Sequence, residues 1–262
     1  MQIPTQDYFS LKFIEPCIMS PSGSRIIGGD EVRAHSFPWQ VALRNRKARS
    51  SRCAGTFVAP QWLLTTAHCV DQDLVAANWL ALSGAHDLLN LESPRVAHPI
   101  SKVILHEAFD LNTFDNDVAL LKLSQPVSWN RVRSPICLPP QGYEIPGGTQ
   151  CVITGWGVAT NGRRPLKQAG IPIVEMNTCR RPDWLGSEFT LTERMVCAGY
   201  EHGGIDTCQG DSGGPLVCYI NNHWVQIGLT SFGRGCGLPR KPGVYSKVSK
   251  FVEWIQAIIS RF

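Results

Sequence analysis

Short apolar runs separated by polar turns dominate the chain between residues 39 and 229. The first series spans 41–43, 56–58, 62–64, 103–105 and 118–123, and the second spans 151–153, 171–174, 216–218 and 224–229. Runs of this length, with glycine and proline in the intervening turns, are typical of β-strands. Many short strands and few long helices predict an all-β fold.

The pattern changes at the C-terminus, where apolar residues recur at helical spacing. Phe251, Ile255, Ile258 and Phe262 fall on one face of a helix, which predicts an amphipathic helix over residues 249–262. Ser249 stands where an N-cap is expected, because a serine hydroxyl accepts a hydrogen bond from the first turn. We therefore expect the β-rich region to end in a single helix.

Composition and charge exclude several classes of protein. The net charge of +4 over 262 residues is mild, and no nucleic-acid partner is expected. No run of about eighteen apolar residues predicts a transmembrane helix. Ten cysteines favour disulfides and an oxidising compartment, and without a Cys-x-x-Cys pair a zinc site is not expected. We therefore expect a secreted, extracellular protein without a cofactor.

The first 24 residues differ from the rest of the chain. They are polar, contain Asp7, Lys12 and Glu15, and lack the apolar core of a signal peptide. We expect the secretion signal to lie upstream of this chain or to be missing from it.

Three separate motifs carry candidate chemistry. The run 210–214 reads Gly-Asp-Ser-Gly-Gly and places Ser212 on a tight turn, where a nucleophilic serine needs to be. Alone, this pattern is equally typical of a Gly-rich surface turn. His68 follows a strand-like run that begins at Trp62, and Asp117 precedes another run. Taken singly, His68 is typical of a structural histidine and Asp117 of a turn residue.

Together, in the order His, Asp, Ser, these motifs resemble the chymotrypsin–trypsin family of serine proteases. The resemblance runs from about residue 25 to the C-terminus. Within the family, residues 82–86 and 241–247 are most similar to plasma-type catalytic domains such as that of plasminogen. The resemblance implies two six-stranded antiparallel β-barrels followed by the C-terminal α-helix. The implied division is a pro-segment at 1–25 and a peptidase domain at 26–262, with barrels at about 26–133 and 134–246 and the helix at about 249–262.

The resemblance also implies catalytic roles. Ser212 attacks the peptide carbonyl, His68 takes and returns its proton, and Asp117 orients the imidazole. The backbone N–H groups of Gly210 and Ser212 form the oxyanion hole. Ser231 supports Asp117 and offers backbone contacts to the substrate. None of the three triad positions is substituted, which argues against the alternative, a non-catalytic binding protein on a protease fold.

Specificity for Arg and Lys is implied by Asp206, which stands six residues before Ser212. A carboxylate at the floor of the pocket favours a buried cation. Gly233 and Gly243 match the pocket walls, where a side chain blocks a long basic residue, and Thr207 offers an extra acceptor. On its own, Asp206 is also compatible with an ordinary loop carboxylate.

Two phenylalanines match positions that face the cleft in relatives. Phe232 stands where tryptophan is more usual, and Phe114 matches the position that narrows the pocket next to the scissile residue. Either residue is also compatible with a role in the core.

Activation is implied by the run that begins Arg25-Ile26-Ile27-Gly28-Gly29. In the family, another protease cuts after the basic residue at this place. The new ammonium of Ile26 is then expected to enter a pocket and pair with Asp211, which moves the N–H groups of the oxyanion hole into position.

The spacing of ten cysteines leaves their pairing open. The resemblance implies that one bond keeps the pro-segment attached to the catalytic domain after cleavage. The implied pairs are Cys53–Cys69, Cys151–Cys218, Cys179–Cys197, Cys208–Cys236 and Cys17–Cys137.

Remaining partners follow from the charges and from the family. Ala85 and Arg95 stand where calcium-binding relatives place carboxylates, so no metal is expected. Residues 44–52 carry five positive charges and no acid. This stretch is either a solvated loop or an exosite for an acidic partner. Protein substrates, protein inhibitors and an activating protease are the other expected partners.

Overall fold

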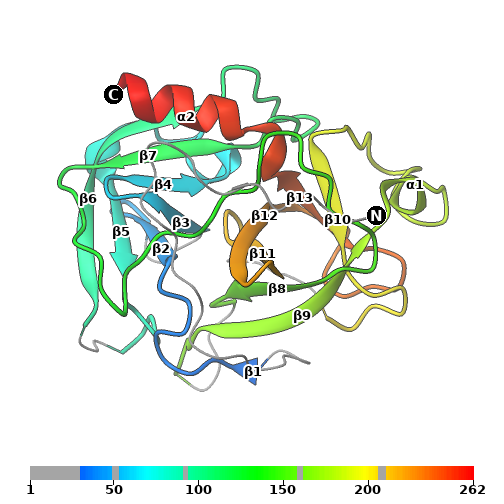
Figure 1. The fold of residues 1–262 in the computed structure, drawn as a ribbon, viewed down its shortest axis with the longest axis horizontal. Coiled ribbons are helices and arrows are strands. Elements are labelled where there is room, and N and C mark those ends of the chain that lie inside the picture. The colour runs from blue at the N-terminus through cyan, green and yellow to red at the C-terminus, as the bar shows by residue number, and fades with distance from the viewer. Residues whose placement is uncertain (1–29, 49–52, 91–93, 158–161, 206–210) are drawn as a thin grey trace.

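The computed structural model describes residues 30–48, 53–90, 94–157, 162–205 and 211–262. Two antiparallel β-barrels lie side by side, and a C-terminal helix lies along the outside of the first barrel (Figure 1). The predicted fold class, all-β with two six-stranded barrels and a C-terminal helix, is confirmed.

The first barrel is a closed sheet in which neighbouring residues of one strand face two different cores. Its strand order is β2-β3-β4-β7-β6-β5, and β5 pairs back with β2. Because side chains alternate along a strand, Val41 and Leu43 point into the barrel, whereas Ala42 packs toward the second barrel. The strands are β2 (Gln40–Asn45), β3 (Cys53–Ala59), β4 (Trp62–Thr65), β5 (Trp79–Ser83), β6 (Val96–Leu105) and β7 (Ala119–Leu123).

The second barrel has the strand order β9-β10-β13-β12-β11-β8, and pairing of β8 with β9 closes it. Strand β1 (Asp30–Glu31) adds to β9, so the start of the described chain is held by the second barrel rather than the first. The barrel interior is filled by Ile153, Ile171 and Leu216, among others. The strands are β8 (Gln150–Gly155), β9 (Lys167–Val174), β10 (Met195–Ala198), β11 (Pro215–Ile220), β12 (His223–Phe232) and β13 (Gly243–Lys247).

The interface between the barrels combines apolar packing with buried hydrogen bonds. Ala54 and Leu64 from the first barrel share one core with Val217 from the second. Two buried bonds cross this interface: Thr56 Oγ1 donates to Gln226 Oε1 (2.7 Å), and Thr154 Oγ1 donates to Gln40 Oε1 (2.8 Å). A buried polar group without a partner is costly, so these bonds favour one relative placement of the barrels.

The C-terminal helix α2 spans Val252–Arg261, and Val252 and Ile255 are its buried residues. The prediction that Ser249 is its N-cap is wrong. Ser249 lies in the preceding 3-10 turn η3 (Val248–Lys250), and its buried hydroxyl has no hydrogen-bond partner among the residues that the structure describes. The N-cap position is Phe251, which offers no side-chain acceptor. The apolar period that predicts the helix does not reveal the 3-10 turn, which moves the helix start past Ser249.

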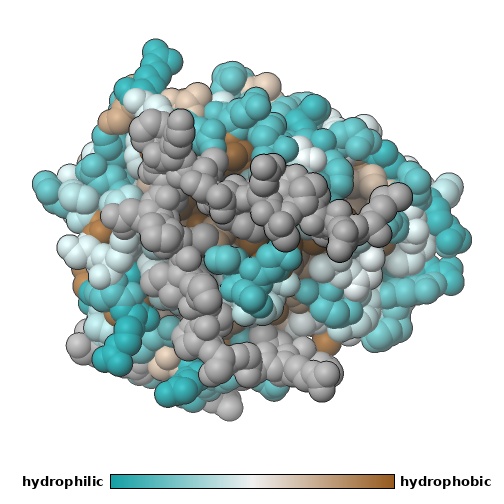
Figure 2. Space-filling model, in the orientation of Figure 1, coloured by the Kyte–Doolittle hydropathy of each residue, from teal (hydrophilic) through white to brown (hydrophobic). Residues whose placement is uncertain are grey.

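The remaining helical elements are short. They are η1 (Ala67–Cys69), η2 (Ala76–Asn78) and α1 (Met176–Cys179). None of the helices in the described residues is long and apolar enough to cross a membrane. Among the residues that carry a colour in Figure 2, hydrophilic ones predominate.

Candidate active site

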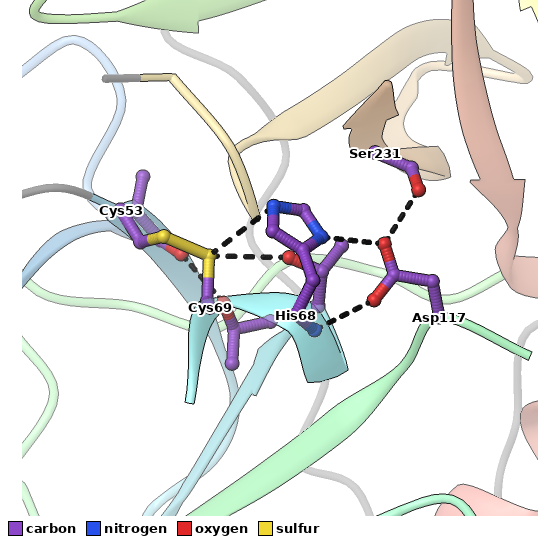
Figure 3. Close-up of a disulfide and its surroundings, with 8 residues drawn as sticks. Cys53, His68, Cys69, Asp117 and Ser231 are labelled. Carbon is purple, nitrogen blue, oxygen red and sulfur yellow. Dashed lines mark hydrogen bonds and ion pairs between the residues drawn. A yellow bond between two sulfur atoms is a disulfide. The ribbon is translucent and has the colours of Figure 1, made fainter. Parts of the chain in front are cut away.

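His68 is presented by a turn that is fixed on both sides. It lies in η1, directly after the fully buried strand β4. Thr65 Oγ1 donates to Ala54 O (2.8 Å), and the Cys53–Cys69 disulfide ties the turn to the start of β3. The imidazole lies between this disulfide and the carboxylate of Asp117 (Figure 3). Its side chain keeps 17% of its surface exposed.

Asp117 is completely buried and lies just before β7. Its Oδ1 accepts a bond from His68 N (2.9 Å), and its Oδ2 lies 2.7 Å from His68 Nδ1. Ser231 Oγ also donates to Oδ2, and Ser246 Oγ donates to the backbone oxygen of Asp117 (2.7 Å). Since an ionised carboxylate only accepts, Nδ1 is the donor in this pair, and in a neutral imidazole Nε2 then carries the lone pair. Nε2 lies on the side of the ring away from Asp117, 4.0 Å from Cys69 Sγ.

Ser212 lies on the turn that precedes β11 and is partly exposed. Its carbonyl accepts a bond from Ala54 N (2.8 Å), which draws the turn onto the first barrel beside the His68 turn. The next residue, Gly213, has φ +74°, and a Cβ there is 2.2 Å from Thr65 Oγ1, so only glycine fits. No hydrogen bond joins Ser212 Oγ to His68 Nε2 in the described part of the chain. Catalytic hydrogen bonds are often long before substrate binds.

Asp211 is buried beneath the same turn. Its Oδ1 accepts a bond from Gly157 N (2.9 Å), and it fills the space that a side chain at Gly155 requires. Gly157 also contacts Arg164, whose Nε donates to Gly157 O (2.8 Å). Burial lowers the pKa of Arg164, and the charge of Asp211 opposes that shift. Arg25 and Ile26 lie outside the described residues, so their part in an ion pair with Asp211 stays a prediction.

Part of the predicted specificity pocket is described. Gly233 follows β12 and Gly243 begins β13, and a Cβ at Gly233 is 3.8 Å from the Cα of Gly243. The two glycines therefore lie next to each other, at the end of β12 and the start of the paired strand β13. Asp206, Thr207 and Gly210 lie outside the described residues.

Three aromatic rings form a row of contacts that begins at His68 and ends at the second barrel. Phe114 meets the imidazole edge to face, with ring centres 5.6 Å apart. Phe232 lies 5.3 Å from Phe114, and Phe189 lies 5.1 Å from Phe232. All three rings are only partly buried. Phe189 was missed in the sequence, where nothing distinguishes it from a core residue.

The described cysteines are all in disulfides. Cys53–Cys69, Cys151–Cys218 and Cys179–Cys197 are bonded, and these are pairs that the resemblance implies. Cys137 and Cys236 are also disulfide-bonded. Their expected partners, Cys17 and Cys208, lie outside the described residues.

One group of possible metal ligands occurs in the described ranges, formed by Cys53, His68 and Cys69. Its ligand atoms lie within 4.8 Å of one another. Both sulfurs belong to one disulfide, however, and offer no thiolate. This group therefore does not fit a metal ion.

The basic stretch at 44–52 is described only up to residue 48. Within it, Lys47 is paired with Asp73 (Nζ to Oδ2, 3.3 Å). Hydrogen bonds from Asn45 and Asn78 lower the pKa of Asp73 to about 2, so this carboxylate stays charged beside the lysine. The pairing offsets part of the positive charge, and binding of an acidic partner to this stretch stays a prediction.

Comparison with known families gives one match. The family model for trypsin matches residues 26–255, which covers both barrels and the first turn of α2.

Proposed function

Because the chain belongs to the trypsin family of serine proteases, we propose that it is a secreted endopeptidase made as a zymogen, which cuts peptide bonds after Arg and Lys. The observation that carries the proposal is the pairing of His68 with the buried Asp117. In a neutral imidazole this pairing makes Nε2 the basic nitrogen, and the turn that carries it lies beside the turn of Ser212, where a Cβ at Gly213 is 3.3 Å from Cys69 Sγ.

The proposed reaction is acyl transfer in two steps. His68 Nε2 takes the proton of Ser212 Oγ as the oxygen attacks the substrate carbonyl, and then passes it to the leaving amine. Asp117 stabilises the imidazolium that forms in between. In the second step a water gives its proton to the same nitrogen and hydrolyses the acyl-enzyme. The N–H groups of Gly210 and Ser212 stabilise the oxyanion, and one such donor contributes about 2.7–4 kcal/mol.

The proposed preference for basic residues rests on Asp206 as the charge at the floor of the pocket. A buried guanidinium or ammonium needs a paired carboxylate, because a lone charge in a dry pocket is costly. The neighbouring glycines at 233 and 243 support the proposal, since neither carries a side chain that could block a long basic residue. Thr207 adds a hydroxyl acceptor.

The proposed activation switch joins the new N-terminus at Ile26 to Asp211. The burial of Asp211 beside the glycines at 155 and 157 supports this role, since it places a carboxylate next to the turn of Ser212. Cleavage after Arg25 by another protease then supplies the cation. We expect Arg25→Gln to give a folded but nearly silent protein.

Turnover of matched peptide amides ending in Arg, Phe or Ala tests the proposal on protein cut after Arg25. We expect strong preference for Arg, and loss of that preference in Asp206→Ser. Ser212→Ala controls for contaminating proteases. Preference for Phe or Ala rules out the pocket assignment. A folded, cut protein that turns over none of these substrates favours a non-catalytic binding protein instead.

The proposed surroundings follow from the disulfides and the family. Disulfides persist in oxidising compartments, which supports secretion. Proteins and peptides are the proposed substrates, and protein protease inhibitors are proposed partners of the same cleft.

A further inference from the structure

A second carboxylate in the loop between β6 and β7 is held by the second barrel. Asp115 stands two residues before Asp117, and its side chain is 15% exposed. Thr192 Oγ1 donates to its Oδ1 (2.8 Å), as does Arg194 Nε (2.9 Å). Arg194 Nη2 donates to Oδ2, which completes a two-pronged ion pair. Such a pair fixes orientation as well as distance.

The arginine side of this pair is itself anchored. The carbonyl of Arg194 accepts a bond from Lys247 N (2.8 Å) at the end of β13, and its N–H donates to Thr192 Oγ1 (3.2 Å). Arg194 thus has a fixed place in the second barrel, just before β10. Asp115 is consequently held in the frame of the second barrel, although its loop belongs to the first.

The residue next to Asp115 has an unusual backbone. Phe114 has φ +55°, a region that aromatic residues rarely adopt and that persists only when the surroundings enforce it. On the other side, Asp110 Oδ2 accepts a bond from Thr113 Oγ1 (2.9 Å), and Asp110 N donates to Asp115 O (3.0 Å). Phe114 is therefore fixed from both sides.

This backbone decides where the Phe114 ring lies. The ring touches His68 edge to face and stacks at a tilt on Phe232. Loss of the pair with Arg194 removes one of the two restraints on the Phe114 backbone, so the ring is held less firmly beside the imidazole.

We propose that the Asp115–Arg194 pair is a positioning device that holds Phe114 beside His68 and thereby sets which substrate residue is accepted immediately before the basic one. The inference rests on the proposed protease function. With the ring in place, the space next to His68 is narrow and favours a small residue. Without the pair, the space widens.

Two peptide amides that differ only in the residue before arginine, Gly or Leu, test the proposal. The cut wild-type protein is expected to favour the Gly substrate in kcat/KM. Asp115→Asn and Arg194→Gln should each lower this preference about tenfold, mainly through KM. The double variant should lose no more than either single one, because both act through the same pair.

Glu193→Gln is the matched control. Glu193 lies beside Arg194 but pairs with Arg180 (2.7 Å) at an exposed site. Like Asp115→Asn, this variant removes one negative charge, but it leaves the Asp115–Arg194 pair intact. Its Gly-to-Leu ratio should equal that of the wild type. Arg194→Lys keeps the charge without the two-pronged geometry and should give an intermediate ratio.

Three outcomes overturn the proposal. The ratio of kcat/KM for the Gly and Leu substrates is near one in the wild type, it is unchanged in Asp115→Asn, or the double variant loses the sum of the two single losses. Equal losses on both substrates do so too, since they indicate a general structural role. Labelling of Ser212 by an organophosphonate reports the competent fraction of each variant. If Asp115→Asn fails to fold, the ratios of Thr192→Val and Arg194→Lys decide instead, and unchanged ratios refute it. A wild type that neither reacts with the label nor turns over substrate refutes the proposed function instead.

Discussion

Among the residues that the structure describes, two histidine–carboxylate pairs have similar separations and different surroundings. His68 Nδ1 lies 2.7 Å from Asp117 Oδ2 at the edge of the first barrel. His86 Nε2 lies 2.9 Å from Glu31 Oε1, where the loop after β5 meets β1. Both histidines have little exposed surface, 17% and 10% of the side chain. The separation of the two groups therefore does not distinguish the pairs.

The carboxylates differ in their other partners. Asp117 is completely buried and takes its further side-chain bonds from the backbone of His68 and from the neutral hydroxyl of Ser231. Glu31 is 40% exposed and shares its oxygens with Arg163. Hydrogen bonds from His86 and then Arg163 lower the pKa of Glu31. A carboxylate that is neutralised by a guanidinium has less effect on its histidine.

The histidines differ in the surroundings of the ring nitrogen that does not contact the carboxylate. His68 Nε2 lies on the side of the ring away from Asp117 (Figure 3). His86 Nδ1 is buried and has no hydrogen-bond partner among the described residues. A buried nitrogen that no substrate reaches cannot exchange a proton with it. The surroundings of the second nitrogen therefore differ between the two histidines, and this difference supports the proposal that His68 is the base and His86 a structural histidine.

The largest expected effect is on turnover. His68→Ala should lower kcat by about 10⁶-fold, because the base that activates the nucleophile is lost. His86→Ala should leave kcat near that of the parent. Initial rates on an arginine peptide amide, normalised to folded protein, measure both. Equal losses in the two variants contradict the comparison.

Changing the carboxylates sharpens the same contrast. Asp117→Asn should lower kcat by about 10⁴-fold, because the amide no longer holds the imidazole in the required tautomer. Glu31→Gln, a similar change in size and charge, should have little effect on kcat. Rates on the same substrate provide the measurement, and an active Asp117→Asn protein argues against the triad.

Near His86 and Glu31, a substitution should lower the free energy of unfolding rather than kcat. Asp87 is buried beside Glu31 and His86, and it accepts bonds from Arg163, Arg164 N and Leu89 N. Asp87→Ala leaves these donors unpaired and should cost about 1–3 kcal/mol in the free energy of unfolding. Denaturant unfolding at neutral pH measures this loss. A loss of kcat in the remaining folded protein is not expected.

The pH dependence of this loss has a definite sign. Burial opposes ionisation of Asp87, but its hydrogen bonds, first those from the N–H groups of Arg164 and Leu89, more than offset this and lower its pKa. A lowered pKa contributes stability that is present above the ordinary value of 3.8 and is lost as pH falls through the folded value. The difference between parent and Asp87→Ala should therefore shrink in acid. A difference that grows there contradicts the assignment.

The smallest expected effect is that of Glu31→Gln on thermal stability. The pair is exposed, so salt screens it and its contribution is modest. Because the pKa of Glu31 is lowered, the variant should melt slightly below the parent at neutral pH and match it in acid. A melting difference that is independent of both pH and salt contradicts an electrostatic origin.

The local pattern of the sequence predicts much of the fold. The run 118–123 becomes β7 from residue 119 onward, and the run 151–153 falls in β8, because alternation and apolar content are local properties. The prediction that Ser249 is an N-cap failed because the position of this residue is not a local property of the sequence. Its surroundings depend on how η3 packs, which the apolar period of the helix does not contain.

Contacts between distant residues were accessible only through family resemblance. The resemblance led from His68 to Asp117, which lies 49 residues away. It gave nothing on Arg194, which lies 79 residues from Asp115, or on His86 and Glu31, which are 55 residues apart. No period or spacing links such pairs, since the closure of the barrels alone brings them together.

The claim that His68, and not merely a histidine paired with a carboxylate, activates Ser212 can be tested by labelling kinetics. A labelled organophosphonate is added to the cut parent, His68→Gln and His86→Gln, and the adduct is located by peptide mass spectrometry. The account predicts one adduct on Ser212 in the parent, an equal rate in His86→Gln and a rate lower by at least about 10³-fold in His68→Gln. An adduct at another residue, or undiminished labelling of His68→Gln, contradicts it.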